Sequence, residues 1–201
     1  MLFSFLRMLL WVMLMVAVVI SSVVLNKLKI VQKHKILKFI PVILVLILFF
    51  VPFEEMLTFS SPDTAFSGTT VGTPLATAAH EESYGFFYKD RRGSYSVVFF
   101  SETDGRYKKY AEDEIAQIQL GEANGATVEL FRMTDTGERY LLIWAPSDTL
   151  TVEDSLGTAF AVGRSGSDAH PVSFTLAAIA PDADYALTVG GVAVDVSAVT
   201  E

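Results

Sequence analysis

The 201-residue chain has no cysteine and only three histidines, which are His34, His80 and His170. The lack of cysteine excludes disulfides, thiolate metal sites, a cysteine nucleophile and the lipidated cysteine of a bacterial lipoprotein. Because histidine is the side chain used most often as a general base, three histidines also leave little choice for that role.

Acidic residues are missing from the first 53 residues, and this absence divides the chain into two unlike parts. The basic residues of the first part are Arg7, Lys27, Lys29, Lys33, Lys35 and Lys38. From Glu54 onward there are 9 basic and 23 acidic residues, a net charge of −14. A region this negative repels phosphates, which excludes nucleic acid as a partner and leaves cations, basic proteins or neutral glycans.

Two long apolar runs lie in the basic part of the chain. Residues 8–25 carry no charged side chain, and residues 36–53 carry only Lys38, near their start. At about 1.5 Å of rise per residue, each run covers most of a hydrocarbon core about 30 Å thick. The sequence therefore predicts a transmembrane helical hairpin within residues 1–57, with the lipid bilayer as its partner.

The loop of residues 26–35 between these runs is short and basic. The lysines in or beside it are Lys27, Lys29, Lys33, Lys35 and Lys38. The positive-inside rule places such a loop in the cytoplasm, so we expect a two-pass protein of the cell membrane with its C-terminal domain outside. The alternative is a signal peptide cleaved near Ser21 or Ser22, which would leave one span and deliver the domain inward. An outer domain without disulfides favours a bacterial envelope.

Residues 58–80 are poor in charge and rich in small and polar side chains, which is typical of a linker. Within them, Ser61 can cap a helix and Pro62 can occupy its first position, so a single helical turn over residues 61–66 is expected. Gly68 argues against a longer helix.

The remaining residues, 81–201, are expected to form an all-β domain, an antiparallel meander or sandwich. About eleven short strands are predicted, at residues 84–88, 94–101, 106–110, 115–120, 127–133, 139–145, 150–153, 158–162, 172–179, 185–189 and 192–196. Gly190 and Gly191 between two of them are the strongest hairpin signal. A break at residues 146–148 allows an Ig-like C-terminal layer and leaves open whether the β part is one domain or two.

Aromatic side chains are dense between residues 84 and 110. Neighbouring residues on a strand face opposite sides of its sheet, so Phe86 and Phe87 cannot share a face. One face is therefore expected to expose aromatics suited to a sugar or a protein partner, unless a second layer or the membrane covers it. The aromatics predicted for this surface are Tyr84, Phe86, Tyr88, Tyr95 and Phe99.

No catalytic, metal-binding or cofactor-binding residue is predicted. His80 begins a His-Glu-Glu run but lacks the second histidine of a zinc-protease motif. His170 follows Ser165, Ser167 and Asp168, yet no G-x-S-x-G elbow accompanies them. The aspartates in predicted turns lack the alternating spacing of a calcium loop.

Three stretches carry a resemblance to a known class of proteins. They are LTFSSPDTAFSG, YGFFYKDRRGSYSVVFF and DADYALTVGGVAVDV, which together resemble small, uncharacterised, membrane-anchored extracytoplasmic β-domain proteins of Gram-positive bacteria. The two predicted spans depart from the lipoprotein or single-anchor arrangement of that class, and the resemblance implies no catalytic residues.

Three functions remain open at this level. The first is a non-enzymatic binding or interaction module at the cell envelope, held by its helical hairpin and contacting an envelope protein or a glycan. The second is an anchored hydrolase that uses acidic residues with a divalent cation. The third is a small membrane sensor or accessory subunit.

Overall fold

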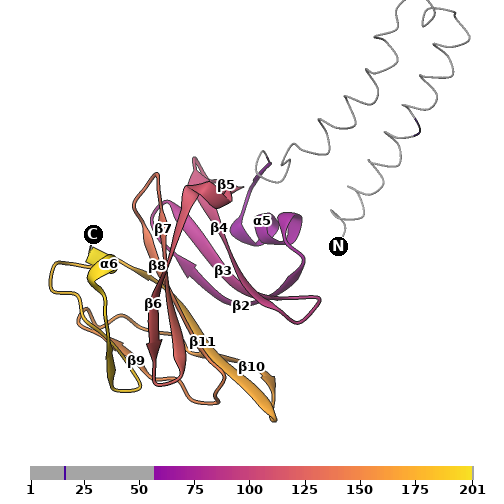
Figure 1. Cartoon of the computed structure of the whole chain (residues 1–201). Helices are drawn as coiled ribbons and strands as arrows, with labels where there is room; N and C mark the ends of the chain where they lie inside the picture. The colour runs from indigo at the N-terminus through magenta and orange to yellow at the C-terminus, as the bar shows by residue number, and fades with distance from the viewer. Residues whose placement is uncertain (1–15, 17–56, 201) are drawn as a thin grey trace, which may run out of the picture.

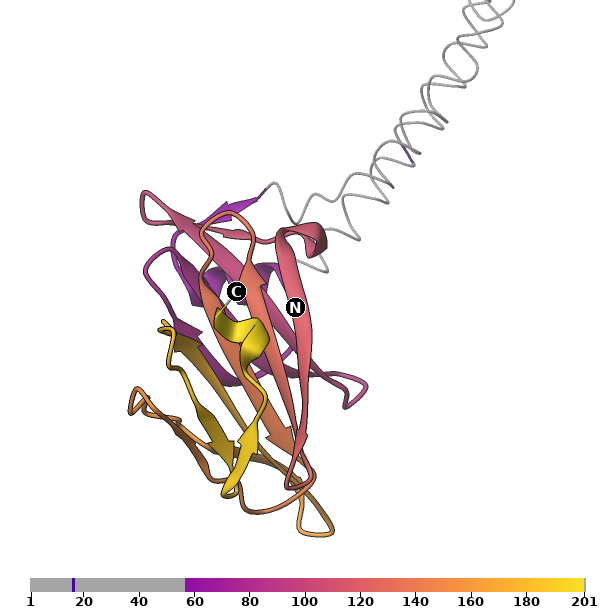
Figure 2. The same cartoon turned by 60° about the vertical axis from the view of Figure 1, so that its left-hand side comes forward.

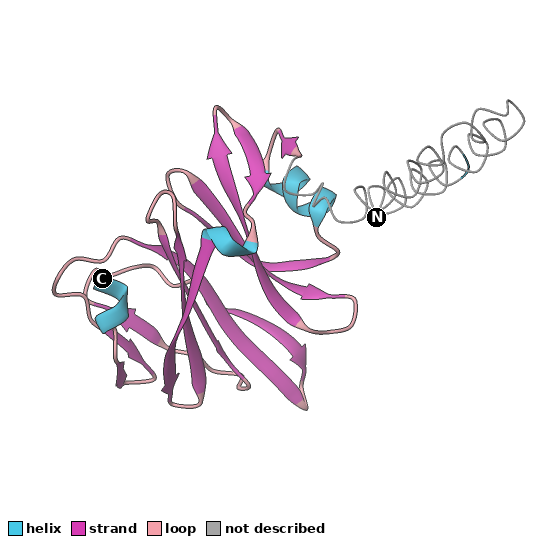
Figure 3. Cartoon of the chain, turned by 45° about the horizontal axis from the view of Figure 1, so that its top comes forward, coloured by secondary structure: helices cyan, strands magenta, loops and turns pink. Residues whose placement is uncertain are grey.

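The computed structural model describes residue 16 and residues 57–200. Strands dominate this part of the chain, and every strand pair in it is antiparallel (Figure 3). The prediction of a mainly-β, antiparallel domain is therefore confirmed. Apart from residue 16, both predicted spans and the loop between them lie outside the described residues. No helix within the described residues is long and apolar enough to cross a membrane.

The first sheet has five strands in the order β1-β5-β4-β3-β2 (Figure 1). Its strands are β1 (Thr58–Phe59), β2 (Gly72–Ala79), β3 (Ser83–Asp90), β4 (Tyr95–Thr103) and β5 (Arg106–Lys109). Strands β2 to β5 follow one another as a meander, and β1 adds beside β5 to complete the far edge. The aromatic strands β3 and β4 therefore lie inside the sheet, away from both edges.

Residues 58–80, expected to be a linker, instead form β1, the helix α5 (Pro62–Thr69) and β2. The helix begins where the sequence predicts, with Ser61 as N-cap accepting a hydrogen bond from the N–H of Thr64 at 3.2 Å. It continues past Gly68 because its buried face packs on the first sheet through Phe66. Gly68 itself allows this close packing, since a Cβ there would lie 2.5 Å from the ring of Phe59.

The second sheet also has five strands, in the order β10-β11-β8-β7-β6. They are β6 (Ile115–Ala123), β7 (Ala126–Met133), β8 (Arg139–Ala145), β10 (Gly163–Ser167) and β11 (His170–Ile179). The 3-10 helix η2 (Glu112–Glu114) leads into β6. Strand β11, which follows the break at residues 146–148, pairs with β8, which precedes it. Chain from both sides of the break thus builds one sheet.

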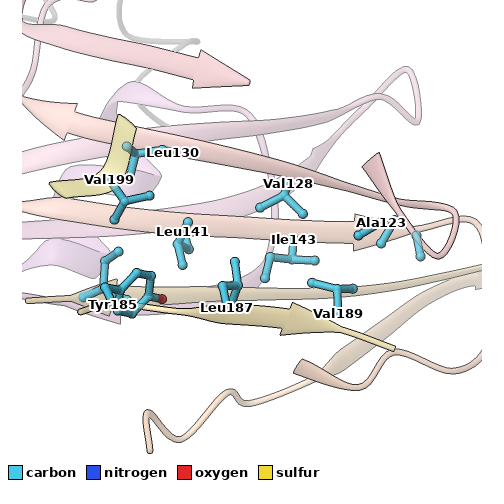
Figure 4. Close-up of a cluster of buried hydrophobic side chains, with 12 residues drawn as sticks. Ala123, Val128, Leu130, Leu141, Ile143, Tyr185, Leu187, Val189 and Val199 are labelled. Carbon is cyan, nitrogen blue, oxygen red and sulfur yellow. The ribbon is translucent and has the colours of Figure 1, made fainter. Parts of the chain in front are cut away.

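The third sheet is small, with the order β13-β12-β9. Its strands β9 (Val152–Asp154), β12 (Leu187–Val189) and β13 (Val192–Val194) are followed by the short helix α6 (Ser197–Thr200). Figure 4 shows Leu187 and Val189 facing the side chains of the second sheet, and these residues belong to one buried apolar cluster. The third sheet therefore covers one face of the second.

The other face of the second sheet packs against the first sheet. Phe87 and Phe99 of the first sheet share a buried cluster with Tyr140, Leu142 and Phe174 of the second. The order of layers is α5, first sheet, second sheet and third sheet, so the second sheet is buried on both faces. This stacking accounts for the nearly continuous apolar run of β8, which shows little alternation.

One predicted strand, at residues 158–162, does not form. Phe160 packs into the core from an irregular segment, and the strand that pairs with β11 is β10, a few residues later. The predicted turns do form. Asp104 and Gly105 join β4 to β5 with φ of 52° and 71°, and Gly190 and Gly191 join β12 to β13 with φ of 58° and 78°. Two successive positive φ angles are typical of the type I′ turn.

Candidate functional site

The aromatics predicted for a binding surface lie on both faces of the first sheet. Tyr84, Phe86 and Tyr88 occupy every second position of β3 and lie on one face of the first sheet. Tyr95 and Phe99, on β4, lie on the opposite face of that sheet. Phe86 and Phe99 are each only 1% exposed. They are core residues because α5 covers the first face and the second sheet covers the other, so neither is available to a partner.

Partly exposed tyrosines remain on the α5 side of the first sheet. Tyr84, Tyr88 and Tyr107 share this side and pack against the cluster that α5 covers; we call these three residues the tyrosine face. Tyr88 meets Phe66 of α5 edge-on at 5.5 Å between ring centroids. Tyr84 meets Tyr107 edge-on at 6.4 Å. The tyrosine face therefore borders α5 and is built from two strands of one sheet, β3 and β5.

Tyr107 is the member of this face that the sequence prediction missed. The turn at Asp104 and Gly105 sets the register of the β4–β5 hairpin and places Tyr107 directly opposite Glu102. Residues directly opposite in an antiparallel pair share a face. The Asp-Gly turn signal, read together with this rule, would have placed Tyr107 beside Tyr84.

The hydroxyl of Tyr107 donates a hydrogen bond to the carboxylate of Glu102 at 2.9 Å. This hydrogen bond, with smaller contributions from burial and from the negative charge of Glu102, raises the pKa of Tyr107. Tyr107 thus stays a protonated donor and holds the Glu102 carboxylate at its hydroxyl, while its ring meets Tyr84 edge-on. A carboxylate next to tyrosine rings suits a sugar, whose hydroxyls donate to the carboxylate and whose C–H faces pack on aromatics.

A second group of polar side chains lies where the first and second sheets meet. It consists of His80, Ser83, Glu138 and Tyr140, and we call it the junction cluster. Ser83, Glu138 and Tyr140 are buried, at 2%, 8% and 0% exposed, while the His80 side chain is 23% exposed. His80 and Ser83 flank the turn between β2 and β3, and Glu138 lies just before β8.

Glu138 is the centre of the junction cluster. Its Oε1 accepts from the backbone N–H of Glu82 at 2.8 Å and lies 2.8 Å from Nδ1 of His80. Its Oε2 accepts from the hydroxyl of Ser83. The Ser83 oxygen is also 2.7 Å from the Tyr140 hydroxyl, which donates to it because the serine proton is directed at Glu138. Burial raises the pKa of Tyr140, so its phenol stays protonated.

This geometry differs from that of a nucleophilic serine site. In such a site the histidine contacts the serine and the carboxylate orients the histidine. Here the carboxylate of Glu138 stands between His80 and Ser83, so the histidine cannot take the serine proton directly. The junction cluster satisfies buried polar groups and ties two sheets together.

The other candidates from the sequence are dispersed. His170 is exposed at the start of β11 and faces Ser167 across the β10–β11 hairpin. The Tyr95 hydroxyl donates a hydrogen bond to the Ser165 hydroxyl at 3.4 Å. Among residues 57–200 and residue 16, no group of three or more His, Asp or Glu side chains is placed to hold a metal ion. The topology lysines, Lys27, Lys29, Lys33, Lys35 and Lys38, lie outside the described residues.

No protein-family model, curated protein or solved structure matches this chain. No relative therefore lends it an activity or a partner.

Proposed function

We propose that this chain is a membrane-anchored protein of the cell envelope, whose β domain lies outside the cytoplasm and binds an envelope component without catalysis. Two features of the sequence support the anchoring. The apolar runs at residues 8–25 and 36–53 have the length of spans, and the lysine-rich loop at residues 26–35 favours a cytoplasmic bend. The resemblance to Gram-positive extracytoplasmic proteins agrees with this placement.

The observation that carries the binding role is the tyrosine face. Tyr84, Tyr88 and Tyr107 stay partly exposed on a sheet in which Phe86 and Phe100, on the same face, are buried. Tyrosine suits a binding surface that is solvated in the free protein and buried in the complex, because its ring is apolar and its hydroxyl is polar. With the Glu102 carboxylate held beside Tyr107, the face fits a neutral glycan of the envelope best.

A non-catalytic role is supported by the way the buried polar groups are used. The carboxylate of Glu138 accepts bonds from Ser83 and from the backbone of Glu82, and Tyr140 donates to Ser83. A general acid or base must be free to reach a substrate proton. In the junction cluster, the Glu138 carboxylate and the Ser83 and Tyr140 hydroxyls already form hydrogen bonds within the protein, so they are not free to reach a substrate proton.

The experiment that tests the proposal measures binding of purified wall glycan fragments to the full chain in detergent micelles. The variants Tyr84→Ala and Tyr107→Ala should each weaken binding by at least about tenfold, as expected for an aromatic in the centre of an interface. Tyr95→Ala is the matched control, because Tyr95 is a partly exposed tyrosine on the opposite face of the same sheet. Absence of glycan binding, or an equal loss in Tyr95→Ala, would contradict the proposal.

A further inference from the structure

The outer edge of β6 is a long strand edge without a partner in the described part of the chain. β6 is the last strand of the second sheet and pairs only with β7 (Figure 2, where it descends from η2 along one side of the domain). In an antiparallel sheet, every second residue of an edge strand directs its N–H and C=O away from its neighbour. Strand β13 approaches β6 through core side chains, and no backbone hydrogen bond joins the two strands among the described residues.

The other strand edges of residues 57–200 are short or carry features that discourage pairing. β1 has 2 residues, and β9 and β13 have 3 each. β2 contains Pro74 and an irregular register just after it. β10 has 5 residues, among them two glycines and Arg164. Charges, prolines and short length are the usual protections of a strand edge.

β6 lacks most of these protections. It has 9 residues, and from Ile115 to Gly121 it contains neither a charged residue nor a proline. Its one irregularity is a bulge between Gln119 and Gly121, which leaves a regular ladder over Ile115–Gln119. Gln117 and Gln119 are exposed and uncharged. This ladder is long enough to pair with an added strand.

The charges around β6 indicate which kind of strand could pair with its free edge. Glu112, Asp113 and Glu114 precede the ladder and Glu122 follows it. Residues 110–200 contain 14 acidic and 3 basic residues, a net charge of −11, whereas residues 57–109 contain 6 of each. The free edge thus belongs to the acidic side of the domain and has carboxylates at both of its ends.

This distribution disfavours a second copy of the chain as the occupant. In an antiparallel self-pairing centred on Ile118, Glu114 of each copy would lie opposite Glu122 of the other. A parallel self-pairing would align each acidic end with itself. Like charges placed directly opposite across a strand pair are destabilising, whereas opposite charges stabilise it.

We propose that the free edge of β6, over Ile115–Gln119, accepts an extended segment of a partner protein that carries lysine or arginine at both ends of a short uncharged core. Main-chain hydrogen bonds along the ladder supply affinity, and the flanking carboxylates select for cationic ends. This inference goes beyond the glycan role of the tyrosine face and uses a different sheet.

The test uses two fluorescent nonapeptides as probes for the full chain in uncharged detergent micelles. Both have the core Val-Thr-Val-Thr-Val; one is flanked by two lysines at each end and the other by two glutamates. The lysine-flanked peptide should bind at least about tenfold more tightly, since charge complementarity favours it. Its binding should also slow hydrogen exchange at the amides of Gln117 and Gln119, which face away from β7; the Ile115 amide already donates to the Glu112 carbonyl.

Variants of the edge separate this site from others. The double variant Gln117→Lys, Gln119→Lys should weaken binding of the lysine-flanked peptide by at least about tenfold, while Gln117→Glu, Gln119→Glu should retain it. The side chains of Gln117 and Gln119 are exposed, so circular dichroism should show both double variants folded. Equal or absent binding of the two peptides, or protection at other residues only, would overturn the proposal.

The outcomes also distinguish the two proposals from each other. Substitutions at Gln117 and Gln119 leave the tyrosine face unchanged, because that face belongs to the first sheet. In the unsubstituted chain, glycan binding without binding of the lysine-flanked peptide rejects the edge proposal alone, and peptide binding without glycan binding rejects the glycan role alone.

Discussion

Oε1 of Glu138 lies 2.8 Å from Nδ1 of His80, and this contact joins a turn of the first sheet to a turn of the second. The same nitrogen lies 2.9 Å from the N–H of Glu81. A protonated Nδ1 donates to Glu138, and an unprotonated Nδ1 accepts from Glu81, so the two bonds exclude each other. In either state Glu138 keeps its bonds from Ser83 and from the backbone of Glu82.

Removing the Glu138 carboxylate should therefore loosen the junction between the sheets. Glu138→Ala leaves the Ser83 hydroxyl and the Glu82 N–H without their acceptor, and we expect a loss of about 2 to 4 kcal/mol in the free energy of unfolding. Urea denaturation of the full chain in detergent measures this. Glu153→Ala, at an exposed acid in β9, is the control and should change stability by less than about 0.5 kcal/mol. Equal effects of the two variants would show that the junction cluster is not structural.

The burial of the first sheet on both faces gives a second prediction. Phe86→Ala and Phe99→Ala should each cost about 3 to 5 kcal/mol, because each removes a ring that is 1% exposed from a packed cluster. Tyr84→Ala, on the same strand as Phe86 but partly exposed, should cost clearly less. Thermal unfolding of the three variants compares them. A small effect at Phe86 would mean that α5 does not cover it.

Much of this fold is visible in the sequence where local chemistry decides it. The Asp104-Gly105 and Gly190-Gly191 turns specify their hairpins because they supply two successive residues that tolerate positive φ. Ser61 and Pro62 likewise mark the start of α5. The central strands are harder to assign to a layer, since a strand buried on both faces shows no alternation.

The errors arise where distant contacts decide the structure. Residues 58–80 look like a linker because their composition is small and polar, yet Phe59 and Phe66 anchor them to the first sheet. The prediction that Phe86 and Phe99 are exposed considers one sheet alone, with two open faces. Both residues are buried because α5 covers Phe86 and the second sheet covers Phe99, and no local sequence pattern reveals these layers.

The carboxyl of Glu129 gives a prediction about pH. Burial raises the pKa of Glu129 above its usual value, so folding favours its protonated form. Its contribution to stability is therefore fully present below the unfolded pKa and is lost as pH rises through the folded pKa. Glu129→Gln should be more stable than the parent chain at about pH 7, and the difference should shrink towards about pH 4.

Urea denaturation of both chains at the two pH values measures that difference. Glu153→Gln, at an exposed position, should show no such pH-dependent gap. A Glu129→Gln variant that is less stable at neutral pH would mean that the charged form of Glu129 is favoured by the fold.

The turn that positions Tyr107 gives a further prediction. Gly105 has φ of 71°, and a Cβ there would meet nothing within 4 Å, so Gly105→Ala should cost about 1 kcal/mol through backbone strain alone. Asp104→Gly, at the neighbouring positive φ of 52°, should be tolerated. Chemical denaturation gives both values. If Gly105→Ala were neutral, the type I′ turn would not set the register of Tyr107 and Glu102.

The location of the β domain outside the cytoplasm is the central claim, and protease accessibility in intact cells tests it most directly. A C-terminal epitope on the full chain should be removed by protease added to intact cells, while a cytoplasmic marker protein stays whole. Removal of the epitope only after lysis would place the domain inside and contradict the account.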